Sequence, residues 1–186
     1  MNTMRKIAYC FLTLHVFLWL TACQNKTETT TFSSEGVTLE VPVDWRFNGL
    51  EKDGLYAPKE FTWSIGEFSS LGIYVYDRRK MEHFDDVTLE WFYHRFTRRS
   101  FSEFTNGSSI SETKNAVSID GMEGIHAVIT IELFGEITTE VTILQKETRN
   151  LRALILFNTT SAVNPSDSVN ISGLIEPVLA TLSITD

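Results

Sequence analysis

The sequence lacks a hydrophobic run long enough to cross a bilayer. Its longest mostly apolar stretch, residues 7–20, would cover about 21 Å as a helix, whereas the hydrocarbon core of a bilayer is about 30 Å thick. The stretch follows the basic residues Arg5 and Lys6 and precedes the small residues Thr21 and Ala22. This is the layout of a secretory signal peptide, so we predict that residues 1–22 are one.

Cysteine is also scarce, with only Cys10 and Cys23 in the chain. An ordinary signal peptidase prefers small residues at the first and third positions before the cut, and Leu20 fits poorly for a cut after Ala22. The residues "LTAC", Leu20 to Cys23, resemble instead the lipobox of bacterial lipoproteins. The resemblance implies cleavage before Cys23, a diacylglyceryl thioether on its sulfur and acylation of the new amino terminus. Two or more acyl chains hold a protein stably on a membrane.

Two alternatives to the lipobox remain. Cys23 can form a disulfide with Cys10 or be a buried or reactive thiol. The N-x-S/T triplets that begin at Asn25, Asn106, Asn158 and Asn170 would also suit a secreted glycoprotein, although such triplets are frequent in chains rich in Ser and Thr. If the signal peptide is removed, Cys10 goes with it, and the mature chain is expected to have no disulfide.

Positive charge is in deficit. The whole chain carries 16 basic against 24 acidic residues, and loss of Arg5 and Lys6 with the signal peptide leaves 14 basic residues and a net charge of about −10. Such acidity argues against a nucleic-acid partner and against electrostatic adhesion to anionic lipid. We therefore expect membrane attachment through lipid alone.

Motifs for common chemistry are missing from the sequence. It contains no G-x-S-x-G, H-E-x-x-H, P-loop or Rossmann pattern. "HFDD", His83 to Asp86, offers an imidazole and two carboxylates, but a metal needs three or four converging ligands, and carboxylates before a helix are favoured by its dipole. We expect no metal, no cofactor and no enzymatic activity. A hydrolase that uses His83, His94 or His126 is the remaining enzymatic alternative.

What the sequence does contain is a series of strand patterns. Val37, Leu39 and Val41 alternate with polar residues up to Pro42, and the run 151–158 is apolar at nearly every position, as in a strand covered on both faces. Ser69 and Ser70 are expected to form a turn, and so are Asp120 and Gly121. The other predicted strands cover residues 61–68, 71–77, 109–119, 125–134 and 138–146.

Two segments have helical periodicity. In residues 88–104, Leu89, Phe92 and Phe96 share one face, Thr88 can cap the helix, and Val87 can pack on Phe92. The second segment begins near residue 171 and is interrupted by Pro177, which predicts a kink or a late start. Its apolar stripe consists of Ile171, Leu174, Ile175, Val178, Leu179 and Leu182.

Because strands follow one another without intervening helices, we predict an α+β fold with a mostly antiparallel sheet flanked by helices. Three segments, "GVTLEVPVDW" at 36–45, "SIDGMEG" at 118–124 and "LIEPVLATLSI" at 174–184, resemble the PsbP-like fold. This α/β/α sandwich is shared by the photosystem extrinsic protein, DcrB-type envelope lipoproteins and mycobacterial lipoproteins. The predicted domain covers residues 35–186, and residues 23–34, the lipidated cysteine and a polar segment, are expected to form a flexible tether.

One surface stands out as a candidate partner-binding site. Basic residues cluster before and within the first predicted helix, and they could bind an acidic partner, lipid phosphates or polyanionic glycans. The alternative is a solvated helix face, since Glu90, His94 and Arg98 form an i, i+4 row. The candidate residues are Arg78, Arg79, Lys80, Arg95, Arg98 and Arg99.

Aromatic residues suggest a further site, because Trp45, Trp63 and Trp91 could line a hydrophobic pocket or simply build an aromatic core. The sequence thus predicts a non-enzymatic binding or scaffolding module anchored in the bacterial cell envelope, with an envelope protein as partner. The alternative function is a carrier of a small apolar or lipid ligand in a gap between sheet and helix. If this chain follows the sorting rule of lipoproteins in enteric bacteria, Gln24 after the cysteine, in place of aspartate, implies the periplasmic face of the outer membrane.

Overall fold

The computed structural model describes residues 27–51, 58–101, 109–132, 136–162 and 171–186. Cys23 and the predicted signal peptide lie outside these ranges. Within them, no helix is both long and apolar enough to span a membrane.

The core of the fold is a seven-stranded sheet in which every neighbouring pair is antiparallel. This confirms the predicted α+β class with a mostly antiparallel sheet. The strands, in spatial order, are β3 (Arg46–Glu51), β4 (Lys59–Ile65), β5 (Ser69–Asp77), β9 (Leu151–Ala162), β8 (Glu136–Glu147), β7 (Met122–Glu132) and β6 (Ser109–Ile119).

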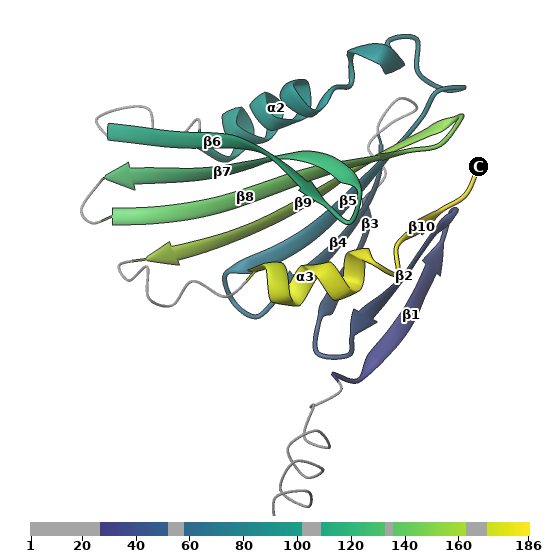
Figure 1. Cartoon of the computed structure of the whole chain (residues 1–186), viewed down its shortest axis with the longest axis horizontal. Helices are drawn as coiled ribbons and strands as arrows, with labels where there is room; N and C mark the ends of the chain where they lie inside the picture. Colours follow the sequence, from purple (N-terminus) through teal and green to yellow (C-terminus); the bar gives the residue numbers. More distant parts are fainter. Residues whose placement is uncertain (1–26, 52–57, 102–108, 133–135, 163–170) are drawn as a thin grey trace, which may run out of the picture.

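Smaller elements cover the two faces of this sheet (Figure 1). Helix α2 (Leu89–Phe101) follows the short 3-10 helix η1 (Phe84–Asp86) and packs on one face. Helix α3 (Ile171–Leu179) packs on the opposite face. It is joined there by a second, three-stranded sheet, with the order β1 (Thr29–Ser34), β2 (Val37–Pro42) and β10 (Ser183–Ile184).

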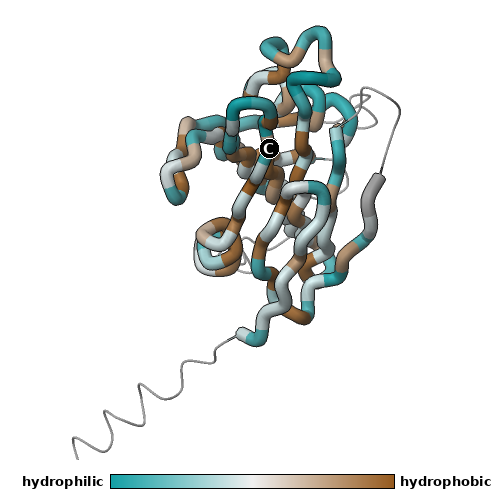
Figure 2. Tube along the Cα trace, turned by 90° about the vertical axis from the view of Figure 1, so that its right-hand side faces the viewer, coloured by the Kyte–Doolittle hydropathy of each residue, from teal (hydrophilic) through white to brown (hydrophobic). Residues whose placement is uncertain are grey.

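The main sheet therefore separates two hydrophobic cores, and apolar segments gather between the layers in Figure 2. Leu151 to Phe157 of β9 are all buried, as predicted for a strand covered on both faces. Along β7, Ala127, Ile129 and Ile131 face the α2 core, whereas the residues between them are less buried. The predicted alternation of this strand is confirmed, with Leu133 outside the described residues.

The turns were predicted with mixed success. Asp120 and Gly121 have φ values of 51° and 74°, and they form the expected tight turn between β6 and β7. The predicted turn at Ser69 and Ser70 is wrong, because both residues pair with β9 and the chain turns at Gly66 (φ 62°) just before them. Glycine tolerates this left-handed conformation, which a seryl residue rarely adopts.

The predicted flexible tether is wrong for residues 29–34. These residues form β1, which pairs along its whole length with β2. Phe32 provides the physical reason, because its ring lies 5.0 Å from that of Trp63, 5.1 Å from that of Phe47 and 5.5 Å from that of Phe61. The folded part of the chain thus begins before residue 35, and β3 fills part of the segment 46–60 that the sequence pattern left unassigned.

Helix α2 agrees with its prediction. The Thr88 hydroxyl accepts a hydrogen bond from the Trp91 amide at 3.1 Å, which confirms the cap, and Val87 and Phe92 are buried in the same core. Helix α3 agrees less well. It begins at Ile171 and contains Pro177, so there is no late start, and Leu174 of the predicted stripe is 37% exposed.

Candidate binding surface on helix α2

The structure divides the six candidate basic residues into two groups. Arg78, Arg79 and Lys80 lie in the turn after β5, close to the segment that leads into α2, whereas Arg95, Arg98 and Arg99 lie in the second half of the helix. Ten residues separate Thr88 from Arg98, which is about 15 Å of helix. The structure thus places the six in two groups on different elements.

The group in the turn is neutralised by nearby carboxylates. Arg79 contacts both carboxylate oxygens of Asp77 at 2.9 Å, and this hydrogen bond lowers the pKa of Asp77 and raises that of Arg79. Arg78 lies 3.5 Å from Asp85 and 3.4 Å from Glu147. Lys80 is 4.0 Å from Asp77. These cations stabilise the turn locally and are already paired, so they are poor candidates for a binding site.

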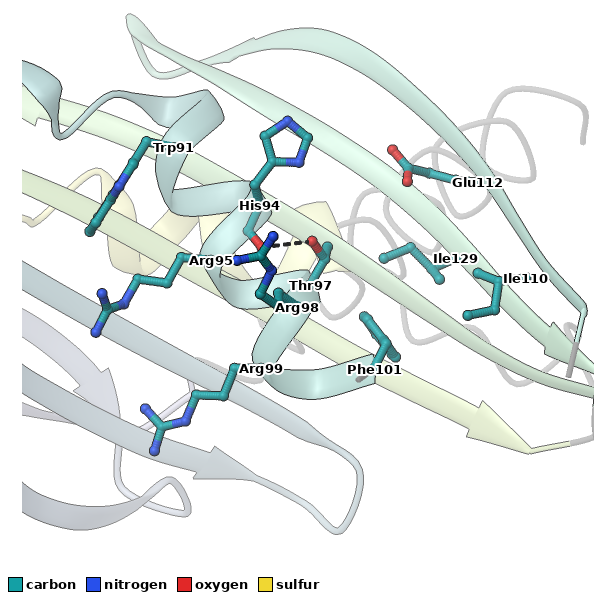
Figure 3. A pocket seen from close by; sticks show the side chains of 10 residues that line it. All are labelled: Trp91, His94, Arg95, Thr97, Arg98, Arg99, Phe101, Ile110, Glu112 and Ile129. Carbon is teal, nitrogen blue, oxygen red and sulfur yellow. Dashed lines mark hydrogen bonds between the residues drawn. The ribbon is translucent and has the colours of Figure 1, made fainter. Parts of the chain in front are cut away.

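The group on α2 is different, because none of Arg95, Arg98 and Arg99 forms an ion pair within the described part of the chain. Arg95 lies over the ring of Trp91, 5.3 Å from its centroid. In Figure 3, Trp91, Arg95 and Arg99 extend from one flank of the helix, away from Ile110 and Glu112 of β6. His94 extends from the opposite flank.

Tyrosines of β5 form the floor on the arginine flank. The Tyr76 ring packs edge-on against Trp91 at 6.4 Å, and Tyr74 lies 4.8 Å from Phe92. Burial is the largest cause that raises the pKa of both phenols, and the nearby Glu60 raises it further, whereas Arg99 lowers the pKa of Tyr74 and Arg95 that of Tyr76. Both phenols are therefore neutral at physiological pH and carry no charge that could pair with the arginines.

The opposite flank of α2 carries paired charges. Glu90 is 2.9 Å from Lys114 of β6 and 3.8 Å from His94, and Lys114 also lies over the ring of Tyr93. The predicted row Glu90, His94 and Arg98 is thus formed only between its first two members.

Around the helix, a cavity of about 1180 Å³ is lined by residues of both flanks, which are Trp91, His94, Arg95, Thr97, Arg98, Arg99, Phe101, Ile110, Glu112 and Ile129.

The tryptophans belong to different environments. Trp45 and Trp63 are buried in the core on the α3 side, as expected for an aromatic core, whereas Trp91 is 37% exposed and lines the α2 cavity. A planar aromatic ring next to guanidinium groups is suited to bind anionic or polar planar groups of a partner.

The other candidate residues do not converge on one site. His83 lies 3.7 Å from Asp86, His94 lies on α2, and His126 of β7 shares a hydrogen bond of 3.0 Å with Thr142 of β8. Within the ranges that the structure describes, no three His, Cys, Asp or Glu residues are grouped as metal ligands. Asp85 and Asp86 lie in η1, where Asp85 pairs with Arg78.

A second cavity, of about 480 Å³, lies between α3 and the main sheet. It brings together His126, Glu140 and Glu176 from three elements, a combination that the sequence analysis missed. The only sequence signal was strand alternation, which places residues 140, 142 and 144 on one face of β8. The remaining lining residues are Val117, Ser118, Ile119, Thr142, Leu144, Ile155, Phe157, Ile175 and Leu179.

No family model matches the sequence, and no curated protein matches it. The structure is similar to cyanobacterial PsbP (CyanoP) from Synechocystis, with 14% identity, 88% of this chain and 96% of that chain covered, and a TM-score of 0.47. The Ran-binding protein Mog1p of Saccharomyces cerevisiae has 10% identity, 87% and 97% coverage and a TM-score of 0.46.

LpqN, which is involved in cell envelope biogenesis of Mycobacterium tuberculosis, has 12% identity, 87% and 93% coverage and a TM-score of 0.44. A PsbP protein is thus among the similar structures. Identities this low concern the fold alone.

Proposed function

We propose that this protein is a non-enzymatic binding module of the bacterial cell envelope, tethered by lipid at Cys23, and that the second half of α2 binds an acidic protein partner. The observation that carries the proposal is the set of Arg95, Arg98 and Arg99, which have no ion pair among the described residues of a strongly acidic chain.

Electrostatics supports this assignment. In a domain of net negative charge, repulsion discourages most acidic partners, so a local positive patch selects the orientation in which such a partner can approach. Arginine adds geometric selectivity, because its planar guanidinium donates two parallel hydrogen bonds to a carboxylate. The neighbouring Trp91 supplies an aromatic contact, the kind of residue that dominates the energy of many interfaces.

Site-specific photo-crosslinking in intact cells tests the partner surface. A photoreactive aromatic residue in place of Trp91, which lies on the same flank of the helix as Arg95 and Arg99, should capture a partner. The variant R95Q/R99Q should lower the yield about tenfold. Each lost hydrogen bond to a charged group costs about 1.5–3 kcal/mol, and screening by solvent reduces this cost at an exposed site. The matched control is R46Q/R149Q, which removes the same charge from two exposed positions on other elements. Equal yields in the two variants would contradict the proposal.

The lipid anchor has its own test. Cys23→Ser should abolish labelling with radioactive palmitate and shift the protein from the detergent phase to the aqueous phase. Gln24→Asp should leave the label intact and move the protein from outer-membrane to inner-membrane fractions. Unchanged partitioning of the Cys23→Ser variant would rule out the anchor, whereas an unchanged location of Gln24→Asp would rule out only the sorting step.

A second function, carriage of a small apolar ligand, is supported by the cavity between α3 and the sheet. Its volume of about 480 Å³ lies in the range of ligand pockets, and its floor consists of buried apolar side chains. Native mass spectrometry of protein purified without detergent tests this function. A persistent adduct of lipid mass supports it, and a clean mass of the protein alone counts against it.

A further inference from the structure

We propose that the cavity between α3 and the sheet binds an amphiphile that has an apolar chain and a protonated amine. The inference rests on the carrier function proposed above and adds the chemistry of the ligand's head group. It is based on an apolar floor and two carboxylates that line the same cavity.

The floor fits an apolar chain. Leu144, Ile155 and Phe157 of the sheet and Ile175 and Leu179 of α3 line the cavity, and each is at most 5% exposed. They come from the two layers that meet here, so a chain between α3 and the sheet would have apolar contacts on both sides. Each methylene group that such a chain buries contributes about 0.8 kcal/mol.

The acidic groups come from opposite layers. Glu140 is half-buried on β8, and Glu176 is exposed on α3. Neither carboxylate has an ion-pair partner within the described residues. Lys146 lies on the same face of β8 but six residues from Glu140, about 20 Å along the strand, and donates a hydrogen bond to the Leu182 carbonyl at 2.6 Å.

The polar groups of the cavity also determine what the head group must be. Carboxylates only accept hydrogen bonds, and an ammonium group donates three without accepting any. A protonated amine therefore suits a cavity lined by two carboxylates, whereas a carboxylate or phosphate head would be repelled. Nδ1 of the His126 ring is engaged with the Thr142 hydroxyl.

Three probes with the same chain separate the head-group preference from simple apolar binding. Dodecylamine, dodecanol and dodecanoate are titrated at pH 7 into the full mature chain, the two charged probes below their critical micelle concentrations and dodecanol below its solubility limit. Isothermal calorimetry gives the affinity, and amide chemical shifts locate the site. Dodecylamine should bind at least about tenfold more tightly than dodecanol, and dodecanoate more weakly than either.

Matched variants then test the carboxylates. E140Q/E176Q should weaken dodecylamine binding about tenfold and leave dodecanol binding unchanged. The control E67Q/E123Q removes the same charge from two exposed positions away from the cavity and should bind dodecylamine as the wild type does.

The outcomes distinguish the inference from the function on which it rests. Equal affinity for dodecylamine and dodecanol, or an undiminished affinity in E140Q/E176Q, overturns the amine preference and leaves an apolar carrier. Tighter binding of dodecanoate also overturns it. Failure of all three probes to shift amides of α3 and β8 overturns both the preference and the carrier function.

Discussion

At the scale of single residues, Tyr74 and Tyr76 link the α2 layer to the stability of the protein in alkali. Burial raises the pKa of both phenols above the value of about 10 that an unfolded chain has. A raised pKa in the folded state means that stability is fully present below pH 10 and is lost as the pH rises, because the unfolded chain then releases protons that the folded chain retains.

Each of these tyrosines should therefore lower the free energy of unfolding by about 1.4 kcal/mol per pH unit above pH 10. Urea unfolding at several pH values between 9 and 11.5 measures the slope. Y74F/Y76F should reduce this slope by about 2.8 kcal/mol per pH unit. A slope equal to that of the wild type would show that the phenols ionise in the folded state as freely as in the unfolded one.

Gly124 on β7 is required by close packing. A Cβ atom at this position would lie 2.4 Å from the carbonyl oxygen of Ile143 and 2.5 Å from Leu144 Cδ2. Gly124→Ala must therefore push β7 away from β8, and we expect a loss of about 3 kcal/mol. Gly121→Ala is the control, because nothing lies within 4 Å of its Cβ and only the left-handed backbone, about 1 kcal/mol, opposes it. Equal losses in urea unfolding would refute the packing argument.

Residue-level roles that depend on neighbours in sequence were predictable, and those that depend on distant contacts were not. The Thr88 cap follows from a local pattern, and the structure confirms it. The neutralisation of Arg78 by Glu147 depends on the hairpin between β8 and β9, some seventy residues away in the chain. No spacing rule connects such positions.

At the scale of elements, Arg152 of β9 attaches the start of α2 to the sheet. Its side chain is 90% buried, and it donates hydrogen bonds to the carbonyls of Phe84 and Val87 and to Glu147. Arg152→Met should cost about 2 kcal/mol, because the Val87 carbonyl loses its donor and Glu147 keeps only its weaker contacts with Arg78 and Gln145. Arg149→Met, at an exposed position, should cost less than about 0.5 kcal/mol in the same urea titration.

The test of the Arg152 contact also has a structural readout. Amides of α2 should exchange with solvent faster in Arg152→Met than the global loss of stability explains, since the anchoring of the helix is lost first. Uniform acceleration across the whole protein would mean that Arg152 contributes to overall stability without any special role for α2.

Strand β1 offers a direct test of the corrected tether boundary. Phe32→Ala removes ring contacts to Phe47, Phe61 and Trp63, and we expect a loss of about 2 kcal/mol, below the range for a fully buried ring because Phe32 is half-buried. Thr31→Ala, an exposed neighbour, is the control. A flexible tether would tolerate both changes, so an unaffected Phe32→Ala variant would restore the original prediction.

Elements in which apolar residues recur with a clear period were predictable from the sequence, and elements without such a period were not. β7 and β9 follow the alternating and fully buried patterns of their positions in the sheet. β1 buries one aromatic ring among polar residues, so it has no detectable period, and the two-residue β10 is too short for one. β3 contains Gly49 and a register shift next to it, which hide its alternation.

At the scale of the whole molecule, the main sheet separates two candidate sites. The α2 cavity lies on one face and the α3 cavity on the other, the first with arginines and the second with glutamates that form no ion pair with the residues that the structure describes. The first could be anticipated because its arginines are close together in sequence. The second could not, because Glu140 and Glu176 meet only after strand pairing and the docking of α3.

The two layers share β9, whose residues alternate between the cores, and this predicts that the domain unfolds as one unit. Leu154 contributes to the core under α2 and Ile155 to the core under α3, so neither core can open fully while the other stays intact. Phe32→Ala weakens only the α3 side directly, yet the most protected amides of β2 and of α2 should lose the same free energy of exchange, about 2 kcal/mol. Native-state hydrogen exchange at low denaturant measures both; a loss confined to β2 would mean that the α2 layer is an independent folding unit and that β9 does not couple the two faces.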